Sequence, residues 1–291
     1  MRGLARDPRP DGSRSPASPA PGSATRRCVT RLSAVEFDAC WELLGLGDTP
    51  LTLELPSPGH TWAQRHQVLT EVLGALDRRG LVERFAPSEA VAAPLRILAR
   101  PDYQVDLRLD GPDGPLIGIG AVAGAAAVCL VQAGDQLRMT PIWPRRLVTE
   151  VVELVGPMRA GLGRPVNIPV AVFDAARRAT TDGKLWTMAD ELVALGVPRL
   201  DAASWVRMCT GIRSVGQLGT ATWVERVPRF GPWAIGFQRT EAGDFLQLRR
   251  PGPDGGTVTV CPLDAPRLTR LTTELLAATL PKARESVLSA Q

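Results

Sequence analysis

The sequence is poor in the side chains on which most catalytic and metal sites depend. Its 291 residues contain only two histidines and one tyrosine. The histidines, His60 and His66, are six residues apart, which does not place both on one face of a helix, and no cysteine or carboxylate cluster accompanies them. We therefore expect no metal site, and we interpret both histidines as residues of an exposed loop and a helix flank.

The common motifs for a nucleophile and for phosphate binding are also missing. Neither G-x-S-x-G nor G-x-x-x-x-G-K-[ST] occurs. Residues Gly118–Gly124 look superficially like a dinucleotide fingerprint, but the third glycine is one position too far along and a strand pattern follows instead of a helix. We interpret these glycines as positions where a strand crosses under a close neighbour.

Two carboxylate pairs remain as candidates for acid–base chemistry. They are Asp102 with Asp106, and Asp190 with Glu191. Neither pair comes with a partner base or a pocket motif, so each carboxylate is better explained as a helix cap or a surface charge. We predict that the protein is not an enzyme and that it uses no cofactor and no metal.

The sequence has no apolar run long enough to span a bilayer and almost no lysine. The first of these absences predicts a soluble protein. Of the 34 basic residues 32 are arginine, which together with abundant Ala, Gly and Pro suggests a GC-rich genome. Residues 1–31 hold seven arginines and two aspartates, so the remaining 260 residues carry a net charge of −1 out of the total of +4. A nearly neutral body argues against nucleic-acid binding by the folded part.

The first thirty residues differ in composition from the rest. They are rich in Pro, Ser, Ala and Arg, and no apolar segment follows the basic residues, so this stretch is not a secretory signal. We predict a disordered leader over residues 1–30.

Cysteine usage fits a reducing, cytoplasmic compartment. The five cysteines are an odd number, are widely scattered and contain no C-x-x-C pair. Four of them lie in apolar patterns and are expected to act as small core residues, namely Cys40, Cys129, Cys209 and Cys261.

An internal repeat organises the chain. Residues 136–155 align with residues 257–276 at an offset of 121, with five identities over 20 positions. Each copy reads as an alternating strand, a proline stop and an amphipathic helix with a proline in its first turn. Two similar halves, 31–160 and 161–291, predict one shared sheet with a helical layer from each half, and the Gly/Pro-rich stretch 156–169 is the boundary between them.

Periodicity and capping residues predict the remaining elements. Helices are expected at 33–44, 61–79, 88–100, 144–155, 170–180, 187–195, 199–210 and 265–280. Strands are expected at 51–55, 105–110, in a meander over 115–140, and at 212–227, 233–239, 244–250 and 257–261.

The second half is rich in tryptophan, and its predicted helices combine Trp with Met at helical spacing. Such a pattern is most often core, but Trp and Met are also enriched in apolar grooves that receive a partner's helices. Both interpretations stay open on the sequence alone.

The chain resembles the EspG family, secretion-associated proteins of the type VII (ESX) system of actinobacteria. The resemblance covers residues 30–280 as a series of modest matches in the right order. Its clearest segments are Leu32–Glu42, Leu98–Pro101, Val105–Arg108, Phe230, Leu246–Arg250, Pro253–Gly255 and Pro262.

The resemblance implies an α+β fold in which a central antiparallel sheet is flanked by two helical bundles, with halves related by a pseudo-twofold axis. It implies a cytosolic chaperone that binds the apolar helical tip of PE/PPE-like or WXG-like secretion substrates, and a homodimer is possible without that client. In the family the client docks on one sheet face and the C-terminal bundle. We therefore expect partner contacts from Phe173, Leu185, Trp186, Met188, Leu192, Leu200, Trp205, Met208, Trp223 and Trp233.

Two other function classes stay open from the residues alone. An enzyme of unrecognised type would show a deep pocket lined by perturbed carboxylates. A nucleic-acid-binding module would act through the basic leader and would lose binding when residues 1–31 are removed.

Overall fold

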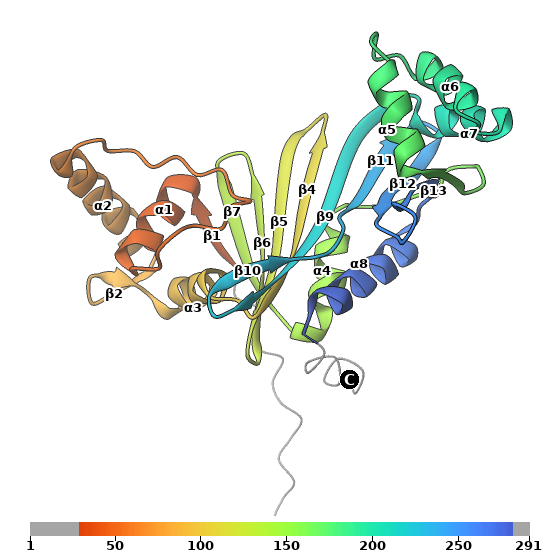
Figure 1. The fold of residues 1–291 in the computed structure, drawn as a ribbon. Helices are drawn as coiled ribbons and strands as arrows, with labels where there is room; N and C mark the ends of the chain where they lie inside the picture. Colours follow the sequence, from red (N-terminus) through yellow and green to blue (C-terminus); the bar gives the residue numbers. More distant parts are fainter. Residues whose placement is uncertain (1–28, 282–291) are drawn as a thin grey trace, which may run out of the picture.

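The computed structural model describes residues 29–281 (Figure 1). The predicted leader lies outside this part of the chain up to residue 28, and so does Cys28. The helices are α1 (Ala34–Leu43), α2 (Trp62–Asp77), α3 (Glu89–Ala99), α4 (Leu147–Glu153, after the 3-10 turn Pro144–Arg146), α5 (Val170–Ala179), α6 (Leu185–Ala194), α7 (Arg199–Cys209) and α8 (Ala265–Thr279).

The strands form one large sheet and one small hairpin. The large sheet contains β1 (Thr30–Ser33), β4 (Tyr103–Gly111), β5 (Gly114–Ala123), β6 (Ala126–Ala133), β7 (Gln136–Ile142), β8 (Val166–Pro169), β9 (Ile212–Val224), β10 (Val227–Phe230), β11 (Ile235–Thr240), β12 (Gly243–Arg250) and β13 (Thr257–Pro262). The hairpin β2 (Val82–Glu83) and β3 (Ala86–Pro87) joins α2 to α3.

Strand order in the large sheet is the same in both halves, read outward from the centre. The order is β1-β7-β6-β5-β4-β9-β11-β12-β13-β8, with β10 paired to β9 outside this path. In each half the first strand (β1 or β8) lies at the edge of the sheet and the last strand (β7 or β13) lies next to it. The first strand of each meander (β4 or β9) lies at the centre. The two halves meet where β4 and β9 pair antiparallel, with Leu107 opposite Leu218.

The repeat seen in the sequence corresponds to this symmetry. Strand β7 and helix α4 of the first half occupy the places that β13 and α8 occupy in the second. Helices α4 and α8 contact one another and share one apolar core with the sheet. The predicted fold, a central antiparallel sheet flanked by two helical bundles with pseudo-twofold related halves, is confirmed.

The two bundles lie on the sheet face opposite to α4 and α8. Helices α1–α3 form a core with β5, β6 and β7, to which Ala121 contributes, and α5–α7 form another with β8, β12 and β13, to which Phe245 contributes. Residues directly opposite one another on adjacent strands point to the same face of the sheet. Ala121 lies opposite Gln104, which lies opposite Ala221, and Phe245 lies opposite Gln238, which lies opposite Val215. Because Val215 and Ala221 are six residues apart on one strand, both bundles cover the same face.

Two glycines bring α4 close to the sheet. A Cβ added at Gly118 would come within 2.5 Å of Leu154 Cδ1, and one at Gly120 within 2.6 Å of Leu147 Cδ1. Only a residue without a side chain lets the helix approach so closely. The interpretation as strand positions beneath a close neighbour is confirmed for Gly118 and Gly120 and is wrong for Gly124, which lies in the β5–β6 turn with a φ of 57° and no atom within 4 Å of an added Cβ.

The expected strand at 51–55 is wrong. Residues in this stretch form a turn and an extended segment, in which Leu53 N–H donates to the Pro50 carbonyl at 3.0 Å. The carbonyl of Glu54 accepts a hydrogen bond from the Gln132 side chain at 2.9 Å instead of one from a neighbouring strand. Burial of Leu53 against the first bundle produced the alternating pattern without a sheet partner. The short strands β1, β2, β3, β8 and β10 were not predicted.

Candidate partner-binding surface

The centre of the sheet is covered on one face only. On the face that carries both bundles, α1–α3 pack on the first-half strands β5, β6 and β7, and α5–α7 pack on the second-half strands β8, β11 and β13. The central strands β4 and β9 have their main helical contacts with α4 and α8 on the opposite face. Figure 1 shows the two bundles at opposite ends of the sheet, with these central strands between them. We call the uncovered surface of β4 and β9 the open face.

The floor of the open face is mostly polar. Strand β4 places Gln104, Asp106, Arg108 and Asp110 on it, because Val105 and Leu107 point into the core shared with α4 and α8. Strand β9 adds Val215, Gln217, Gly219 and Ala221, of which Val215 is 44% exposed. The face is exposed at Arg108, Asp110, Val215 and Gln217 and half-buried at Asp106 and Gly219, whereas Gln104 and Ala221 are buried. Its exposed part is therefore accessible to water or to another molecule.

Asp106 lies in the middle of this floor. Its two carboxylate oxygens accept hydrogen bonds from one donor atom, Nε2 of Gln104, at 2.8 and 3.0 Å. Its neighbours across the sheet are Ile119 on β5 and Gly219 on β9. Burial raises the pKa of Asp106 to about 6, against the hydrogen bond from Gln104, which lowers it.

An apolar ledge borders the open face where β9 turns into β10. Trp223 lies opposite Pro228, and Ala221 lies opposite Phe230, so all four side chains share the face of Gln104. Phe230 is 67% exposed and Trp223 is half-buried. We call Trp223, Pro228 and Phe230 the ledge. The hairpin turn uses left-handed backbone at Glu225 and Arg226 (φ 51° and 68°), the geometry of a two-residue turn between twisted strands.

The ten predicted partner residues divide by burial into three groups. Phe173, Met188, Leu192, Trp205 and Met208 are buried, and Leu185, Trp223 and Trp233 are half-buried. Trp186 and Leu200 are exposed, at 63% and 75%.

The five buried residues are core residues in this structure, and their part in partner binding stays a prediction. They fill the interior of the three-helix bundle α5–α7, where the Phe173 and Trp205 rings pack edge to face with centroids 6.1 Å apart. A three-helix bundle of this size needs large side chains at its centre, and Trp and Met supply them. Trp233 lies on the far face, where the Arg250 guanidinium stacks 5.0 Å from its ring centroid.

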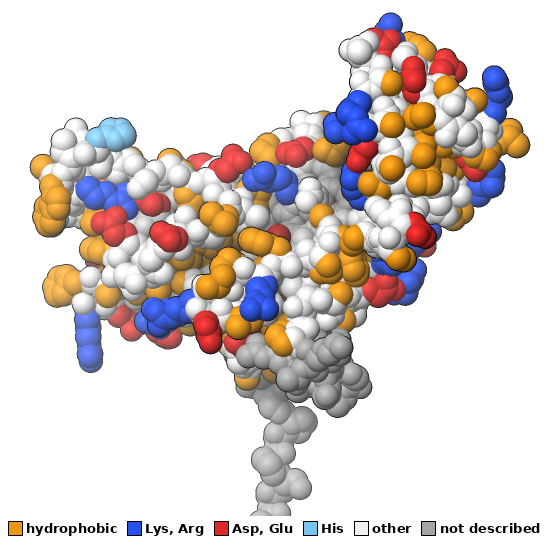
Figure 2. Space-filling view, viewed as in Figure 1, with side chains coloured by type: hydrophobic (Ala, Val, Ile, Leu, Met, Phe, Trp, Pro, Cys, Tyr) orange, Lys and Arg blue, Asp and Glu red, His pale blue; other side chains and the backbone are white. Residues whose placement is uncertain are grey.

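The exposed members of the set lie on the α5–α7 bundle, which projects from the body of the protein. Trp186 is the second residue of α6, and Leu200 is the second residue of α7. Figure 2 shows apolar side chains on the outer surface of this projecting bundle and a hollow between it and the rest of the molecule. Whether Trp186 and Leu200 contact a partner stays a prediction.

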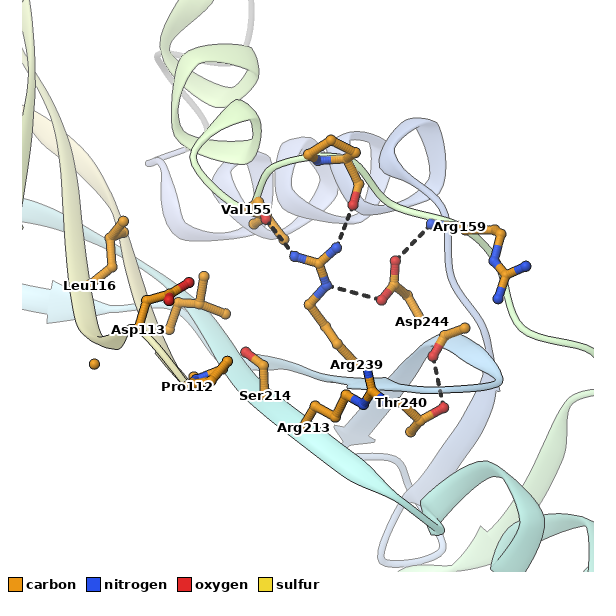
Figure 3. A pocket seen from close by; sticks show the side chains of 15 residues that line it. Pro112, Asp113, Leu116, Val155, Arg159, Arg213, Ser214, Arg239, Thr240 and Asp244 are labelled. Carbon is orange, nitrogen blue, oxygen red and sulfur yellow. Dashed lines mark hydrogen bonds and ion pairs between the residues drawn. The ribbon is translucent and has the colours of Figure 1, made fainter.

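A cavity of about 480 Å³ lies at the seam of the two halves (Figure 3). It is lined by the β4–β5 turn, by Val155–Arg159 and by the β11–β12 turn. Arg239 donates to Asp244 Oδ1 at 3.1 Å, to the Val155 carbonyl at 2.8 Å and to the Pro157 carbonyl, and Asp244 Oδ2 accepts from Arg159 N at 2.7 Å. These bonds fix the crossover between the halves, and neither histidine nor cysteine lines this cavity.

Chemically reactive groups are sparse over residues 29–281. No group of three or more His, Cys, Asp and Glu side chains in this part could hold a metal ion. Cys40, Cys129, Cys209 and Cys261 are all buried, as predicted, and burial raises the pKa of each thiol, to about 12 for Cys40 and Cys129. Within the same described range, no helix combines the length and apolarity that crossing a membrane requires.

The chain is similar to proteins of one family. The model of the EspG family matches residues 33–273. Fourteen chains of solved structures also match. One is the Mycobacterium tuberculosis type VII secretion system chaperone EspG5 in complex with the PE25–PPE41 dimer, with a TM-score of 0.70, 14% sequence identity, and coverage of 88% of this chain and 98% of that chain. No curated protein matches. At this identity the likeness to the solved structure shows the fold.

Proposed function

Because the chain belongs to the EspG family, we propose that it is a cytoplasmic chaperone of type VII (ESX) secretion. It binds the apolar helical tip of a PE/PPE-like or WXG-like substrate, keeps that substrate soluble and delivers it for secretion. The observation that carries this proposal is the family match over residues 33–273, supported by a fold shared with EspG5, whose structure holds a PE25–PPE41 dimer.

The physical argument for a chaperone is that a helical substrate with apolar side chains at its tip would self-associate. Such a patch needs a cover until secretion. The structure offers a rigid scaffold with an open sheet face between two bundles, exposed apolar side chains on α6 and α7, and no metal-ligand cluster over the described residues. Covering and releasing a partner requires no catalytic group, so we assign no catalytic step to this protein.

The test is co-expression with candidate clients. The full chain is expressed with PE–PPE pairs from its own source and with PE25–PPE41, and complexes are measured by size-exclusion chromatography with light scattering. We expect one chain to bind one PE–PPE pair. If none of the helical pairs associates with it, the proposed function is wrong. The free chain is tested in the same way for a homodimer that covers the same apolar side chains.

Substitutions separate surface from core. Trp186→Asp and Leu200→Asp are expected to remove client binding and to leave the melting temperature unchanged. Leu51→Asp is the matched control, since Leu51 is also exposed, at 88%, but belongs to the first half. Met208→Asp places a charge in the bundle interior and is expected to unfold the bundle.

A further inference from the structure

The Asp106 carboxylate has acceptor capacity that its own chain leaves unused. An ionised carboxylate has about four lone-pair sites. In the described part of the chain, the Asp106 carboxylate accepts side-chain hydrogen bonds from one nitrogen only, Nε2 of Gln104, which donates to both of its oxygens. A partner that covered the open face would remove the remaining water from Asp106. Burial of a charge without new hydrogen bonds is costly, so such a partner must bring donors.

The surroundings of Asp106 favour backbone donors over a bulky side chain. Gly219, its neighbour on β9, has open space where a side chain would stand, with no atom within 4 Å of an added Cβ. A glycine at such a place lets another backbone approach the sheet closely. Ile119, the neighbour on β5, is fully buried and leaves the other side of the carboxylate apolar.

The distance between the ledge and Asp106 matches the width of one α-helix. Strands β10, β9 and β4 are successive neighbours about 5 Å apart, and Phe230 shares a row with Gln104, two residues or about 7 Å along β4 from Asp106, so Phe230 and Asp106 are about 12 Å apart. This separation is close to the diameter of one α-helix with its side chains, about 10–12 Å. A helix end seated between them would touch the apolar ledge on one side and the carboxylate on the other.

We propose that Asp106 is the polar anchor of the client-binding face and accepts hydrogen bonds from the free backbone N–H groups at the start of a client helix. The ledge of Trp223, Pro228 and Phe230 receives the apolar side chains of the same helical tip. The first N–H groups of a helix have no partner within it and form the positive end of its dipole, which matches a carboxylate. The inference rests on the proposed function, because it names the residues and chemistry of that same site.

Client affinity then depends on the ionisation of Asp106. The groups that face it are Gln104 and Arg108 on β4, uncharged residues on β9 and β5, and Glu54, which pairs with Arg108 at 3.3 Å. With its pKa raised to about 6, Asp106 is an anion at neutral pH and becomes protonated as the pH falls. A protonated carboxyl accepts poorly from N–H groups, so the client is held more weakly below that pH.

The experiment measures the dissociation constant of the PE–PPE pair from the co-expression test by isothermal titration calorimetry. Asp106→Asn removes the negative charge and replaces one of the two acceptor oxygens with an NH2 donor, and it is expected to weaken binding by about tenfold or more. Asp254→Asn changes an exposed carboxylate in the β12–β13 turn, away from this face, and is the matched control that should bind like the wild type. Phe230→Ser is expected to weaken binding, whereas Val227→Ser, on the other face of the hairpin, should not.

The outcomes distinguish the inference from the function on which it rests. If Asp106→Asn binds like the wild type while Trp186→Asp loses the client, the anchor is overturned and the chaperone stands. If no helical pair binds the wild type, both fail. Support requires weaker binding by Asp106→Asn at neutral pH and a smaller dependence of its affinity on pH between about 5 and 7 than the wild type shows.

Discussion

Gly161 lies directly against the ring of Phe245. A Cβ added at Gly161 would stand 2.0 Å from Cζ of Phe245, which no packed side chain tolerates. The contact joins the crossover between the halves to the core of the second bundle, since Phe245 packs with α5–α7. The course of the chain between its two halves therefore depends on a residue without a side chain.

Gly161→Ala is expected to destabilise the protein by about 3 kcal/mol, because the aromatic ring must leave its place in a packed core. Urea denaturation followed by circular dichroism measures the change. Gly74→Ala is the control: its Cβ would meet only Arg78 Nη1 at 3.7 Å, and it lies inside α2. A gain of about 0.5–1 kcal/mol is expected there. Equal stability of the Gly161→Ala variant and the wild type would contradict the close packing.

Arg239→Met is expected to cost about 3–5 kcal/mol, because Asp244, whose side chain is 6% exposed, would lose its ionic partner. Since Arg239 also binds the carbonyls of Val155 and Pro157, amide exchange over residues 155–161 should accelerate. Arg213→Met removes the exposed ion pair with Glu241 and should change stability by less than about 0.5 kcal/mol. Unchanged exchange in the crossover would show that Arg239 does not fix it.

Asp106→Asn is expected to stabilise the free protein at neutral pH. The pKa of Asp106 is raised from 3.8 to about 6, so the folded state holds the proton more tightly than the unfolded state does. The unfavourable contribution is complete above about pH 6 and disappears as the pH falls towards about 4. A gain of about 1–3 kcal/mol is expected at neutral pH, reduced by partial exposure of the carboxyl. Thermal unfolding at both pH values checks it.

The expected stability of Asp106→Asn also rules out that weaker client binding by this variant results from unfolding. A variant that unfolds less readily and still binds the client weakly has lost a contact and not its fold. Asp110→Asn, on the exposed end of the same strand, should change stability by less than about 0.5 kcal/mol. A stability gain for Asp106→Asn that persisted at about pH 4 would contradict the raised pKa.

The four buried cysteines are expected to be unreactive in the folded protein. Their pKa values are raised by burial, and the thiolate is the form that attacks disulfide reagents. In a Cys28→Ser variant, Ellman's reagent at about pH 8 should label none of them within minutes. All four should react in concentrated guanidinium chloride. Fast labelling of a native thiol would show local opening of the core around it.

Local chemistry predicted the elements well. Ser33 caps α1 by accepting from Glu36 N at 3.2 Å while Glu36 accepts from Ser33 N at 2.8 Å, and Thr61 and Gln64 do the same for α2. These bonds involve residues three apart, so the sequence alone contains them. The meander strands and the repeat at β7 and β13 were likewise visible, because alternation is a local pattern.

Contacts between residues far apart in the chain could not be predicted from the sequence. Pairing of β4 with β9 joins residues more than a hundred positions apart, and nothing local marks it. Helical spacing showed that α6 and α7 bury one face, but not that Trp205 is inside and Trp186 outside. Asp106 was interpreted as a helix cap or a surface charge, because neither its hydrogen bond from Gln104 nor the absence of helices over the central strands is visible in the sequence.

The antiparallel join of β4 and β9 bears on how such a protein could arise. A polypeptide consisting of the first half alone would end its sheet at an unpaired β4, and two copies could satisfy each other's backbone there by pairing β4 with β4 around a true dyad. Gene fusion would turn that dimer into one chain and free each copy to diverge. The open face would then span the former subunit boundary, with Asp106 from one copy and the ledge from the other.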